Sequence, residues 1–434
     1  MIERLNVQFK ADSRKVVLLP FTISNYRIKK VIQRVNSLSE KEVSISLKDI
    51  YNKFSMRHKY FEKILLNNYS SIEKFVADSS VLSRKRKLLL GAYFSREYSI
   101  EAASLFNPSI VEHPNQDGIP KGSKRLVMSL RATGEGHVSS IEFRELVIDK
   151  NCKLKLNNTS RFSVLPAIQN FPINVILEKQ GLSSTDVNDI RYLIERNYKC
   201  SFPKETSVSE RVIFPNSKSE MAGMEDVRLV KFIDKGKISY YGTYTVYNGK
   251  TFSVQLITTR DFTNFDIETI NGPAIHDKGL ALFPEKIDDN YSMIGRIDGE
   301  NLYLLQSKNL YSWSQAELIR QPKNKWEFIQ IGNCGSPLKS DAGWILITHA
   351  VGPLRRYVIS ALLLDLKNPS KIIGSLENPL IEPNKNEREG YVPNVVYSCG
   401  SIIHNNQIII PYAMADSYCG FARIKVEELL RKFK

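Results

Sequence analysis

The sequence predicts an all-β five-bladed β-propeller with an N-terminal α-helical extension and a small helical insert. Three observations predict this fold class. Apolar residues recur at helical spacing before residue 105, short apolar runs alternate with Gly, Asn, Asp and Pro after it, and the second part contains a weak internal repeat. We therefore divide the chain into a basic helical extension, residues 1–105, and a β-propeller domain, residues 106–434.

The N-terminal extension reads as a set of basic helices. Ile28, Ile32 and Val35 recur at helical spacing, Ser39 followed by Glu42 predicts a capping box, and a further helix is expected over residues 84–103. Residues 1–100 hold 20 Lys and Arg against 9 Asp and Glu, which is +11 of the net charge of +15. A solvated helix face explains this charge better than nucleic-acid binding, and a basic arm for another polyanion is the alternative.

The propeller is predicted from two features of residues 106–434: the short apolar runs that alternate with Gly, Asn, Asp and Pro, and an internal repeat. Residues 254–265 align with residues 302–313, and each segment reads as a strand, a polar turn and an aromatic residue. Asp261 and Asn309 take the same place in the two copies, 48 residues apart. A period near 50 residues suits a blade of about four strands, so the length of this part favours about five blades. A helical insert is expected at about residues 184–198.

Composition excludes several classes of protein. The chain has 434 residues, of which 42% are hydrophobic and 25% charged, as in ordinary globular proteins. No apolar run approaches the ~20 residues that span a bilayer, and the N-terminus lacks a signal-peptide pattern, so we expect no membrane partner and a cytoplasmic location. The five cysteines are odd in number and form no C-x-x-C pair, so we expect neither disulfides nor a metal site.

The stretch Gly223 to Arg228 (GMEDVR) is the most informative motif. It puts acidic and basic side chains beside one another where a strand begins. Because successive side chains on a strand point to opposite faces, Glu225 and Arg228 cannot both share a face with Asp226. One carboxylate is therefore singled out. A surface ion pair at a strand end is the alternative interpretation of the same residues.

Other polar residues interrupt the β pattern where a buried strand would not place them. The set is rich in expected cations (Arg131, Lys278, Arg296, His349 and Arg356) and poor in metal-ligand spacings. Several cations with one acid suit an anionic co-substrate such as phosphate, because Arg and Lys position phosphoryl oxygens. The absence of an H-E-x-x-H motif, a nucleophile elbow and a P-loop disfavours protease, esterase and NTPase functions.

These motifs together resemble those of a known family. GMEDVR resembles the G-x-E-D-P-R signature of glycoside hydrolase family 130, the inverting β-mannoside phosphorylases and related β-mannosidases, with Val227 in place of the proline. The resemblance covers about residues 105–425, and it implies a five-bladed β-propeller. Further matching stretches occur in the same order: Asn107-Pro108, KGLALFPEKI (278–287), WILITHAV (344–351), LLLD (362–365), EREGYVPNVVYS (387–398) and PYAMAD (411–416).

The resemblance implies a role for each candidate residue. Asp226 takes the position of the catalytic acid, which sends a proton to the glycosidic oxygen while inorganic phosphate attacks the anomeric carbon from the opposite face. No cofactor is implied besides phosphate as co-substrate. The implied phosphate contacts are Arg131, Lys278, Arg296, His349 and Tyr412. The implied substrate-binding residues are Asn107, Glu225, Arg228 and Asp416, with Glu225 expected to orient Arg228.

The main prediction is thus an enzyme that phosphorolyses a β-mannoside oligosaccharide to mannose 1-phosphate, reversibly. One alternative is an inverting β-mannosidase, in which a second carboxylate activates water. A non-catalytic glycan-binding propeller is another. The linkage and the acceptor sugar are left open. The helical extension is expected to join two subunits as a homo-oligomer. Candidate bases for the hydrolase are Asp298, Glu300, Glu387 and Glu389.

Overall fold

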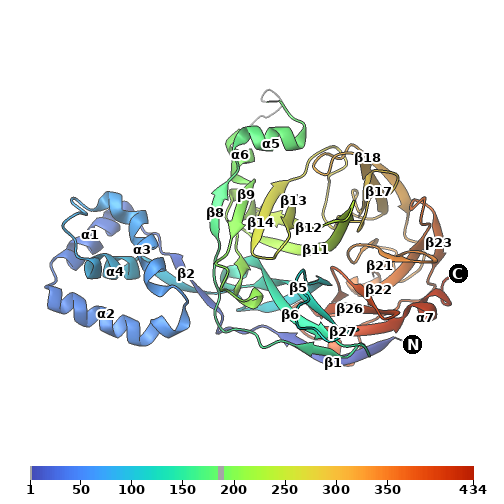
Figure 1. Ribbon diagram of the computed structural model, residues 1–434, viewed down its shortest axis with the longest axis horizontal. Coiled ribbons are helices and arrows are strands. Elements are labelled where there is room, and N and C mark those ends of the chain that lie inside the picture. Colours follow the sequence, from blue (N-terminus) through green and yellow to red (C-terminus); the bar gives the residue numbers. More distant parts are fainter. Residues whose placement is uncertain (1, 184–189) are drawn as a thin grey trace.

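The computed structural model describes residues 2–183 and 190–434, which form a large β-rich body and a small helical bundle set apart from it (Figure 1). A two-stranded antiparallel ribbon, β2 (Val16–Pro20) with β3 (Ser95–Ser99), connects the two parts. The bundle contains the four helices α1 (Asn25–Asn36), α2 (Glu40–Phe54), α3 (Phe61–Ile72) and α4 (Arg84–Tyr93).

The strands of the body form four sheets. The first contains β1 (Glu3–Lys10), β27 (Tyr418–Lys425), β26 (Gln407–Met414), β24 (Val396–Tyr397) and β25 (Ile402–His404). The second has eleven strands: β4 (Ser104–Glu112), β5 (Lys124–Thr133), β6 (Ser139–Ile148), β7 (Leu154–Leu156), β8 (Ala167–Asn170), β9 (Tyr198–Ser201), β10 (Val212–Ile213), β11 (Gly223–Asp234), β12 (Lys237–Tyr247), β13 (Phe252–Thr259) and β14 (Asn264–Thr269). The third has β15 (Ala281–Leu282), β16 (Tyr291–Gly295), β17 (Leu302–Ser307) and β18 (Gln315–Arg320). The fourth has β19 (Gln330–Asn333), β20 (Leu338–Ser340), β21 (Gly343–Val351), β22 (Tyr357–Leu364) and β23 (Ile372–Ser375).

The β-rich class is confirmed, whereas the number of five blades stays a prediction. The eleven-stranded sheet is continuous because one parallel pair, Gly223 with Ser139, joins β11 to β6. Gly223 has φ 131°, and a Cβ there would lie 2.8 Å from the backbone nitrogen of Ser139, so only glycine allows this close approach. The two copies of the sequence repeat fall on equivalent elements, since each starts on a strand, β13 or β17, and crosses the following turn.

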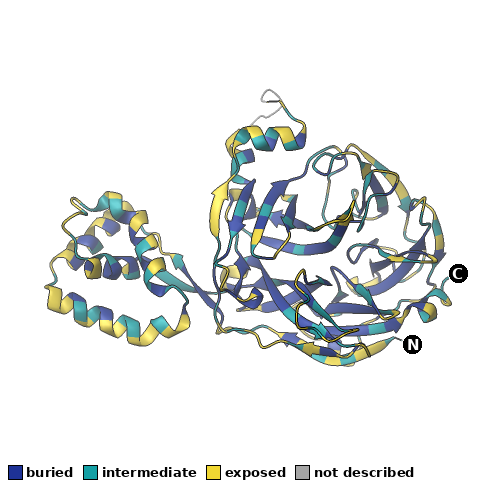
Figure 2. Ribbon diagram, in the orientation of Figure 1, coloured by how far each residue is buried: buried dark blue, intermediate teal, exposed yellow. Residues whose placement is uncertain are grey.

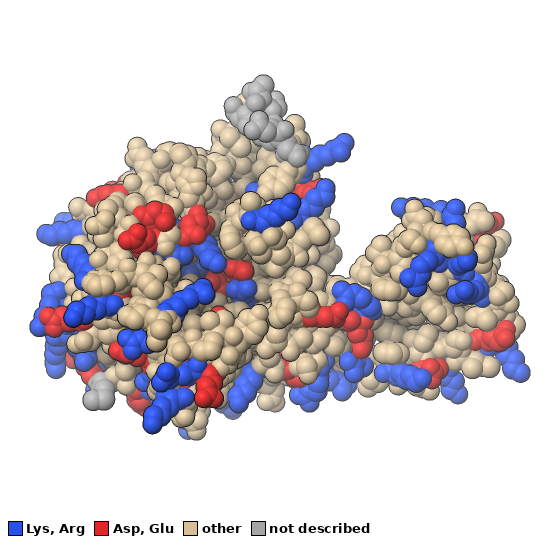
Figure 3. Space-filling view, turned by 180° about the vertical axis from the view of Figure 1, so that it is seen from behind, with Lys and Arg blue, Asp and Glu red and all other residues tan. Residues whose placement is uncertain are grey.

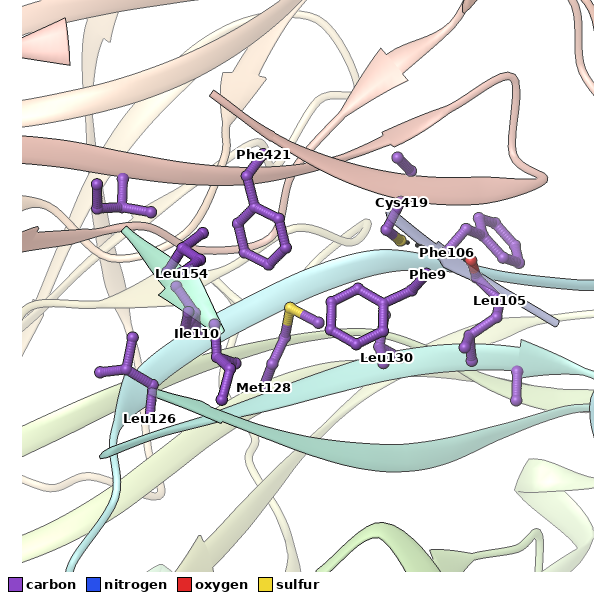
Figure 4. Packing of buried hydrophobic residues seen from close by; sticks show 14 of the residues in the cluster. Phe9, Leu105, Phe106, Ile110, Leu126, Met128, Leu130, Leu154, Cys419 and Phe421 are labelled. Carbon is purple, nitrogen blue, oxygen red and sulfur yellow. Dashed lines mark hydrogen bonds between the residues drawn. The ribbon is translucent and has the colours of Figure 1, made fainter. Parts of the chain in front are cut away.

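The first ten residues do not belong to a helical extension. β1 pairs antiparallel with β27, so strands from the two ends of the chain lie in one sheet. Phe9 of β1 packs against Phe421 and against the core around Leu105, as Figure 4 shows. The Cys419 thiol donates to the Leu105 carbonyl oxygen at 3.4 Å in the same cluster. Apolar side chains of β1 are thus drawn into the core of the body.

The structure confirms the helices predicted within residues 25–93, and it shows that the last of them ends earlier than predicted. Inward faces of the helices are buried and outward faces are exposed (Figure 2), and the Ser39–Glu42 capping box forms at the start of α2. The helix predicted over residues 84–103 ends at Tyr93, because residues 95–99 pair with β2 as a strand. Basic side chains such as Lys29 and Arg34 are exposed, and Figure 3 shows several Lys and Arg on one face of the bundle. The contact of this segment with a second subunit stays a prediction.

A buried ion network anchors the ribbon to the body. Lys15 precedes β2 and is fully buried, and its ammonium group contacts the carboxylates of Glu142 and, at 3.5 Å, Glu101. Arg144 binds the same two carboxylates, and the Lys15 ammonium also donates to the Ser209 carbonyl at 2.9 Å. Removing one member would leave opposite charges buried without a partner, which is costly inside a protein.

Two further expectations concern the insert and the cysteines. Helix α6 (Ile190–Glu195) lies within the predicted insert, and helix α5 (Ile173–Gln180) precedes it. Residues 184–189 of the insert lie outside the described residues, and α7 (Val426–Leu430) follows the last strand. The five cysteines are buried and unpaired. Over residues 2–183 and 190–434, no helix is long and apolar enough to cross a membrane, and the cytoplasmic location stays a prediction.

Candidate active site

A polar cavity of about 190 Å³ lies where segments from all four sheets meet. Its walls hold five guanidinium or ammonium groups but only two carboxylates among the described residues. Eight residues predicted from the sequence line it: Asn107, Arg131, Asp226, Arg228, Lys278, Arg296, His349 and Asp416. The structure therefore brings together residues separated by more than 300 positions in the chain.

Local breaks in the strands direct two polar side chains into this cavity. The β4–β5 pairing is irregular between Phe106 and Ser109, and the β11–β12 pairing between Glu225 and Arg228. Asn107 and Asp226 occupy these breaks with φ of 50° and 58°, a left-handed conformation that Asn and Asp adopt more readily than other non-glycine residues. The Asn107 amide donates to Asp226 Oδ1 at 2.6 Å. Strand alternation alone therefore does not describe the GMEDVR motif, because the break falls within it.

Asp226 lies in a strongly positive environment. Burial by itself would raise its pKa, but the nearby charges of Arg131, Arg228 and Lys278 and the Asn107 hydrogen bond outweigh burial and lower the pKa below its ordinary value. Arg131 Nη1 lies 3.7 Å from Asp226 Oδ1. Without a bound anion, Asp226 is thus a carboxylate at neutral pH.

Glu225 and Arg228 differ from the expected pairing. Arg228 is held by Asn333 Oδ1 at 3.0 Å, by the Tyr397 hydroxyl at 2.6 Å and by the main-chain carbonyl of Asp226 at 3.0 Å. Glu225 instead accepts a hydrogen bond from Arg131 at 2.9 Å and lies 3.6 Å from the Lys278 ammonium. The break at Asp226 rotates the strand, so Glu225 contacts the two cations and does not orient Arg228.

His349 lines the cavity as a neutral side chain and not as a cation. Burial, together with the charges of Arg296 and Arg228, lowers its pKa well below the ordinary value. Its Nδ1 lies 3.0 Å from the Asn333 carbonyl oxygen, which requires Nδ1 to carry the proton and leaves Nε2 as an acceptor. Beside it, Arg296 donates through Nε to Asp277 Oδ2 at 3.0 Å.

Tyr412 was predicted to bind phosphate, but it does not line the cavity. Its side chain is 2% exposed, and its hydroxyl donates to Glu387 Oε1 at 2.7 Å, outside the described lining of the cavity. Arg4 binds the same carboxylate at 2.8 Å. Tyr412 and Glu387 therefore help to hold the N-terminal strand, since β1 brings Arg4 to them. The other proposed bases, Asp298, Glu300 and Glu389, are exposed.

Several residues of the cavity were not predicted from the sequence. Arg356 was the expected cation, but it pairs with Glu382 at 2.9 Å, and Arg355 lines the cavity instead. Leu354 and Arg355 have φ of 56° and 55°, and this turn reverses which of the two arginines points inward. Residues that no role had been assigned to also line the site: Gln330, Tyr357, Val392, Val395 and Tyr397. Only the stretch EREGYVPNVVYS (387–398), which contains Val392, Val395 and Tyr397, was a signal for any of them.

Asp416 is the second carboxylate of the cavity. Burial, together with the charge of Asp226, raises its pKa to about 6 against the opposing charges of Arg131 and Arg355. Ala415 and Asp416 both have φ of 49°, so a turn after β26 sets the direction of this side chain. Two carboxylates in one cavity with pKa values moved in opposite directions are typical of acid–base sites. In the described part of the chain, no cluster of three or more His, Cys, Asp or Glu could hold a metal ion.

Comparison with known proteins identifies relatives of the chain. A model of glycoside hydrolase family 130, described as β-1,4-mannooligosaccharide phosphorylase, matches residues 184–434. A 1,2-β-oligomannan phosphorylase of Thermoanaerobacter sp. (strain X514) is 33% identical over 50% of this chain and 73% of its own length. A β-1,2-mannobiose phosphorylase of the same organism is 35% identical over 48% of this chain and 69% of its own length. The structure of the Listeria innocua β-1,2-mannobiose phosphorylase aligns with a TM-score of 0.50 and 20% identity, over 77% of this chain and 92% of the other, which supports the shared fold.

Proposed function

The chain belongs to glycoside hydrolase family 130, and on this premise we propose that it is an inverting phosphorylase of β-mannosides. The observation that carries the proposal is the cavity, in which one carboxylate, Asp226, is surrounded by the cations Arg131, Arg228 and Lys278. The proposed reaction transfers a mannosyl unit from an oligosaccharide to inorganic phosphate and is reversible. The named phosphorylases among the relatives support this reaction.

The cations of the cavity suit phosphate. Lys278 has 37% of its side chain exposed and only a 3.6 Å contact to Glu225 among the ion pairs of the described residues. Arg131 and Arg296 each keep guanidinium nitrogens beyond those already bonded to Glu225, Ser139 and Asp277. Arginine and lysine bind phosphoryl oxygens through charge-assisted hydrogen bonds. We assign these three residues to phosphate, with His349 Nε2 as an acceptor for a phosphate or sugar hydroxyl.

Binding of phosphate in the cavity also favours the protonated form of Asp226. The cations hold the pKa of Asp226 down when no anion is present. A bound phosphate brings negative charge beside those cations and beside Asp226, and both effects raise the pKa of Asp226. Asp226 then carries a proton at neutral pH and donates it to the glycosidic oxygen. A phosphate oxygen forms the new bond to the anomeric carbon as the carbon–oxygen bond to the leaving sugar breaks, which gives mannose 1-phosphate of inverted configuration.

Asn107 positions the acid and contacts the sugar. Its amide nitrogen donates to Asp226, while its own Oδ1 is buried without a hydrogen-bond partner. A buried acceptor without a partner is costly unless a ligand satisfies it. We assign this oxygen to a hydroxyl of the mannosyl unit. Arg228, fixed by Asn333 and Tyr397, supports the backbone of Asp226, and Asp416 faces the same sugar.

The hydrolase is the second candidate, and Asp416 is the observation that favours it. An inverting hydrolase needs a second carboxylate as a base, about 6.5–9.5 Å from the acid. Of the four carboxylates expected for this role, three are exposed and Glu387 is bound to Arg4 and Tyr412. Asp416, in contrast, lines the cavity. The five cationic side chains of the cavity nevertheless favour phosphate over water as the nucleophile.

One experiment separates these functions. The protein is incubated with β-1,2-, β-1,3- and β-1,4-mannobiose, each with and without inorganic phosphate, and mannose 1-phosphate and free mannose are both measured. Formation of mannose 1-phosphate only with phosphate establishes the phosphorylase and its linkage. Release of mannose at the same rate without phosphate, and no sugar phosphate, would establish the hydrolase. If the protein binds a disaccharide but cleaves none of them, it is a non-catalytic glycan-binding protein.

We also propose that the body is organised as five blades around the cavity. The eleven-stranded sheet then counts as two blades, one around β4–β6 and the other around β11–β14, joined by the single Gly223–Ser139 pair. The supply of cavity residues from every sheet supports this arrangement. A crystal structure that shows five radial sheets would confirm it, and four sheets packed face to face would contradict it.

A further inference from the structure

Asn333 is a buried polar residue that lies behind the wall of the candidate active site. It is the last residue of β19 and is 1% exposed. It is not among the described residues that line the cavity. A residue in this place touches no substrate, so it can act on a reaction in the cavity only through the residues that it holds.

The side-chain amide of Asn333 uses its full capacity for hydrogen bonds. Its Oδ1 accepts from Arg228 Nε and from the main-chain nitrogen of Gly335, both at 3.0 Å. Its Nδ2 donates to the carbonyl oxygens of Gly279 and, at 3.0 Å, Ile294. A side-chain amide has two donor hydrogens and two acceptor lone pairs, whereas an aspartate has no donor and a serine has one. The four partners therefore require asparagine among side chains of this size.

These hydrogen bonds join two sides of the cavity. On one side, Arg228 donates to the main-chain carbonyl of Asp226 at 3.0 Å. On the other side, Gly279 directly follows Lys278, which lines the cavity. Gly279 also packs on Arg228, since a Cβ at this position would lie 3.4 Å from Arg228 Nη2. The acid and the Lys278 segment are thus held against each other, with the Asn333 amide bonded to both.

The main chain of Asn333 adds a third contact. Its carbonyl oxygen lies 3.0 Å from His349 Nδ1 and fixes which ring nitrogen carries the proton. The partners belong to different sheets, because Arg228 is in β11, Ile294 in β16 and His349 in β21. One buried residue therefore sets how three sheets meet behind the cavity.

We propose that Asn333 is a positioning residue, which fixes the separation between the proton donor Asp226 and the phosphate contacts Lys278 and His349. The inference rests on the proposed function for the roles of these residues. In an inverting reaction the acid and the nucleophile act on opposite sides of the sugar, so their relative placement limits the rate. A displacement of about 1 Å can lower the rate about 100-fold.

Replacement of Asn333 by Ser tests this role without adding charge. We expect Asn333→Ser to lower kcat of phosphorolysis about tenfold or more, and to raise Kd for inorganic phosphate, measured by calorimetry, about fivefold or more. Asn197→Ser is the matched control. Asn197 is 2% exposed and its amide donates to the Leu193 carbonyl at 2.7 Å and to Thr269 at 3.0 Å, outside the cavity. This control should leave kcat and Kd unchanged although it also loses buried hydrogen bonds.

A double-mutant cycle separates positioning from a general loss of structure. If Asn333 acts on phosphate through Lys278, Asn333→Ser should change Kd for phosphate less than about twofold when Lys278 is already Gln. Equal fold-changes in the two backgrounds would overturn the inference, and so would a wild-type kcat and Kd in Asn333→Ser. Asn333→Asp, which has the same shape and keeps both acceptors, replaces the serine variant if that variant does not fold.

A crystal structure of the variant tests the inference without reference to activity. We expect the main chain of residues 278–279 to move relative to Asp226, and an unchanged separation would overturn the inference while the phosphorylase function stands. If the wild type binds no phosphate, the proposed function fails, and the separation in the variant then decides the inference alone.

Discussion

Replacement of Asp226 by Asn tests the proposed acid with little change of shape. The side chain keeps its size, and its carbonyl oxygen can still accept the hydrogen bond that Asn107 donates at 2.6 Å. What is lost is the proton donor and one negative charge among Arg131, Arg228 and Lys278. Without the negative charge, the hydrogen bond that Asn107 donates changes from charge-assisted to neutral. This change costs about 1 kcal/mol of folding stability.

The expected loss of turnover is much larger than the loss of stability. A positioned general acid contributes about 10² to 10⁴-fold to the rate. At about 1.4 kcal/mol per tenfold, this corresponds to roughly 3–5 kcal/mol of transition-state stabilisation. The assay measures mannose 1-phosphate formed from a mannobiose and phosphate by the Asp226→Asn variant. Glu317→Gln, a change of an exposed carboxylate on β18 outside the cavity, is the control and should keep the wild-type rate.

A second substrate makes the test specific for an acid. A β-mannoside with a dinitrophenol leaving group needs no protonation, so the Asp226→Asn variant should cleave it far closer to the wild-type rate than it cleaves mannobiose. Equal losses on both substrates would mean that Asp226 acts by binding or by positioning and not as a proton donor. A variant that retains more than about a tenth of the wild-type rate on mannobiose would refute the assignment altogether.

Three further predictions follow from the same contacts. Lys278→Gln should raise KM for phosphate about tenfold or more, because it removes a hydrogen bond to a charged group, and it should change KM for the sugar little. Lys53→Gln on the surface is the control. Equal changes in both KM values would contradict the role of Lys278 in binding phosphate. The pKa of Asp416 is raised to about 6 in the folded protein, so the folded state holds this proton after the unfolded chain has released it, and stability is lost as pH rises from about 4 to about 6. Asp416→Asn should therefore raise Tm over the wild type more at about pH 7 than at about pH 4, and a pH-independent difference would show that the group is not buried as described. Lys15→Met should lower the free energy of unfolding in urea by about 3–5 kcal/mol, since it leaves Glu142 with less compensation, whereas Lys53→Met should cost less than about 1 kcal/mol.

Short-range features of the fold could be predicted because they depend on neighbours in the chain. The Ser39–Glu42 capping box spans three positions, and both hydrogen bonds form as its residue types require. The left-handed conformations of Asn107 and Asp226 were not predicted, although Asn and Asp adopt positive φ more readily than other non-glycine residues. Eight of the sixteen residues that line the cavity were predicted, because they lie where polar residues interrupt apolar strands.

The errors share a different cause, which is contact between distant segments. Tyr412 has the sequence context of a site residue, but its hydroxyl faces Glu387, which Arg4 also binds from the other end of the chain. No local pattern shows that residues 3–10 pair with β27, more than 400 positions away. The charge state of His349 is likewise set by burial and by two arginines from other sheets.

By itself, the sequence determined the β-rich class, the helical texture of residues 25–93 and most of the polar groups around Asp226. These follow from periodicity and residue type, which act over a few positions. Only the tertiary structure decided which of Arg355 and Arg356 faces the cavity, that Glu225 binds Arg131 and not Arg228, and that Asn333 joins Arg228 to Gly279. Those outcomes depend on where backbone breaks and neighbouring sheets place each side chain, and a one-residue change of direction at a bulge or turn exchanges the buried and exposed faces.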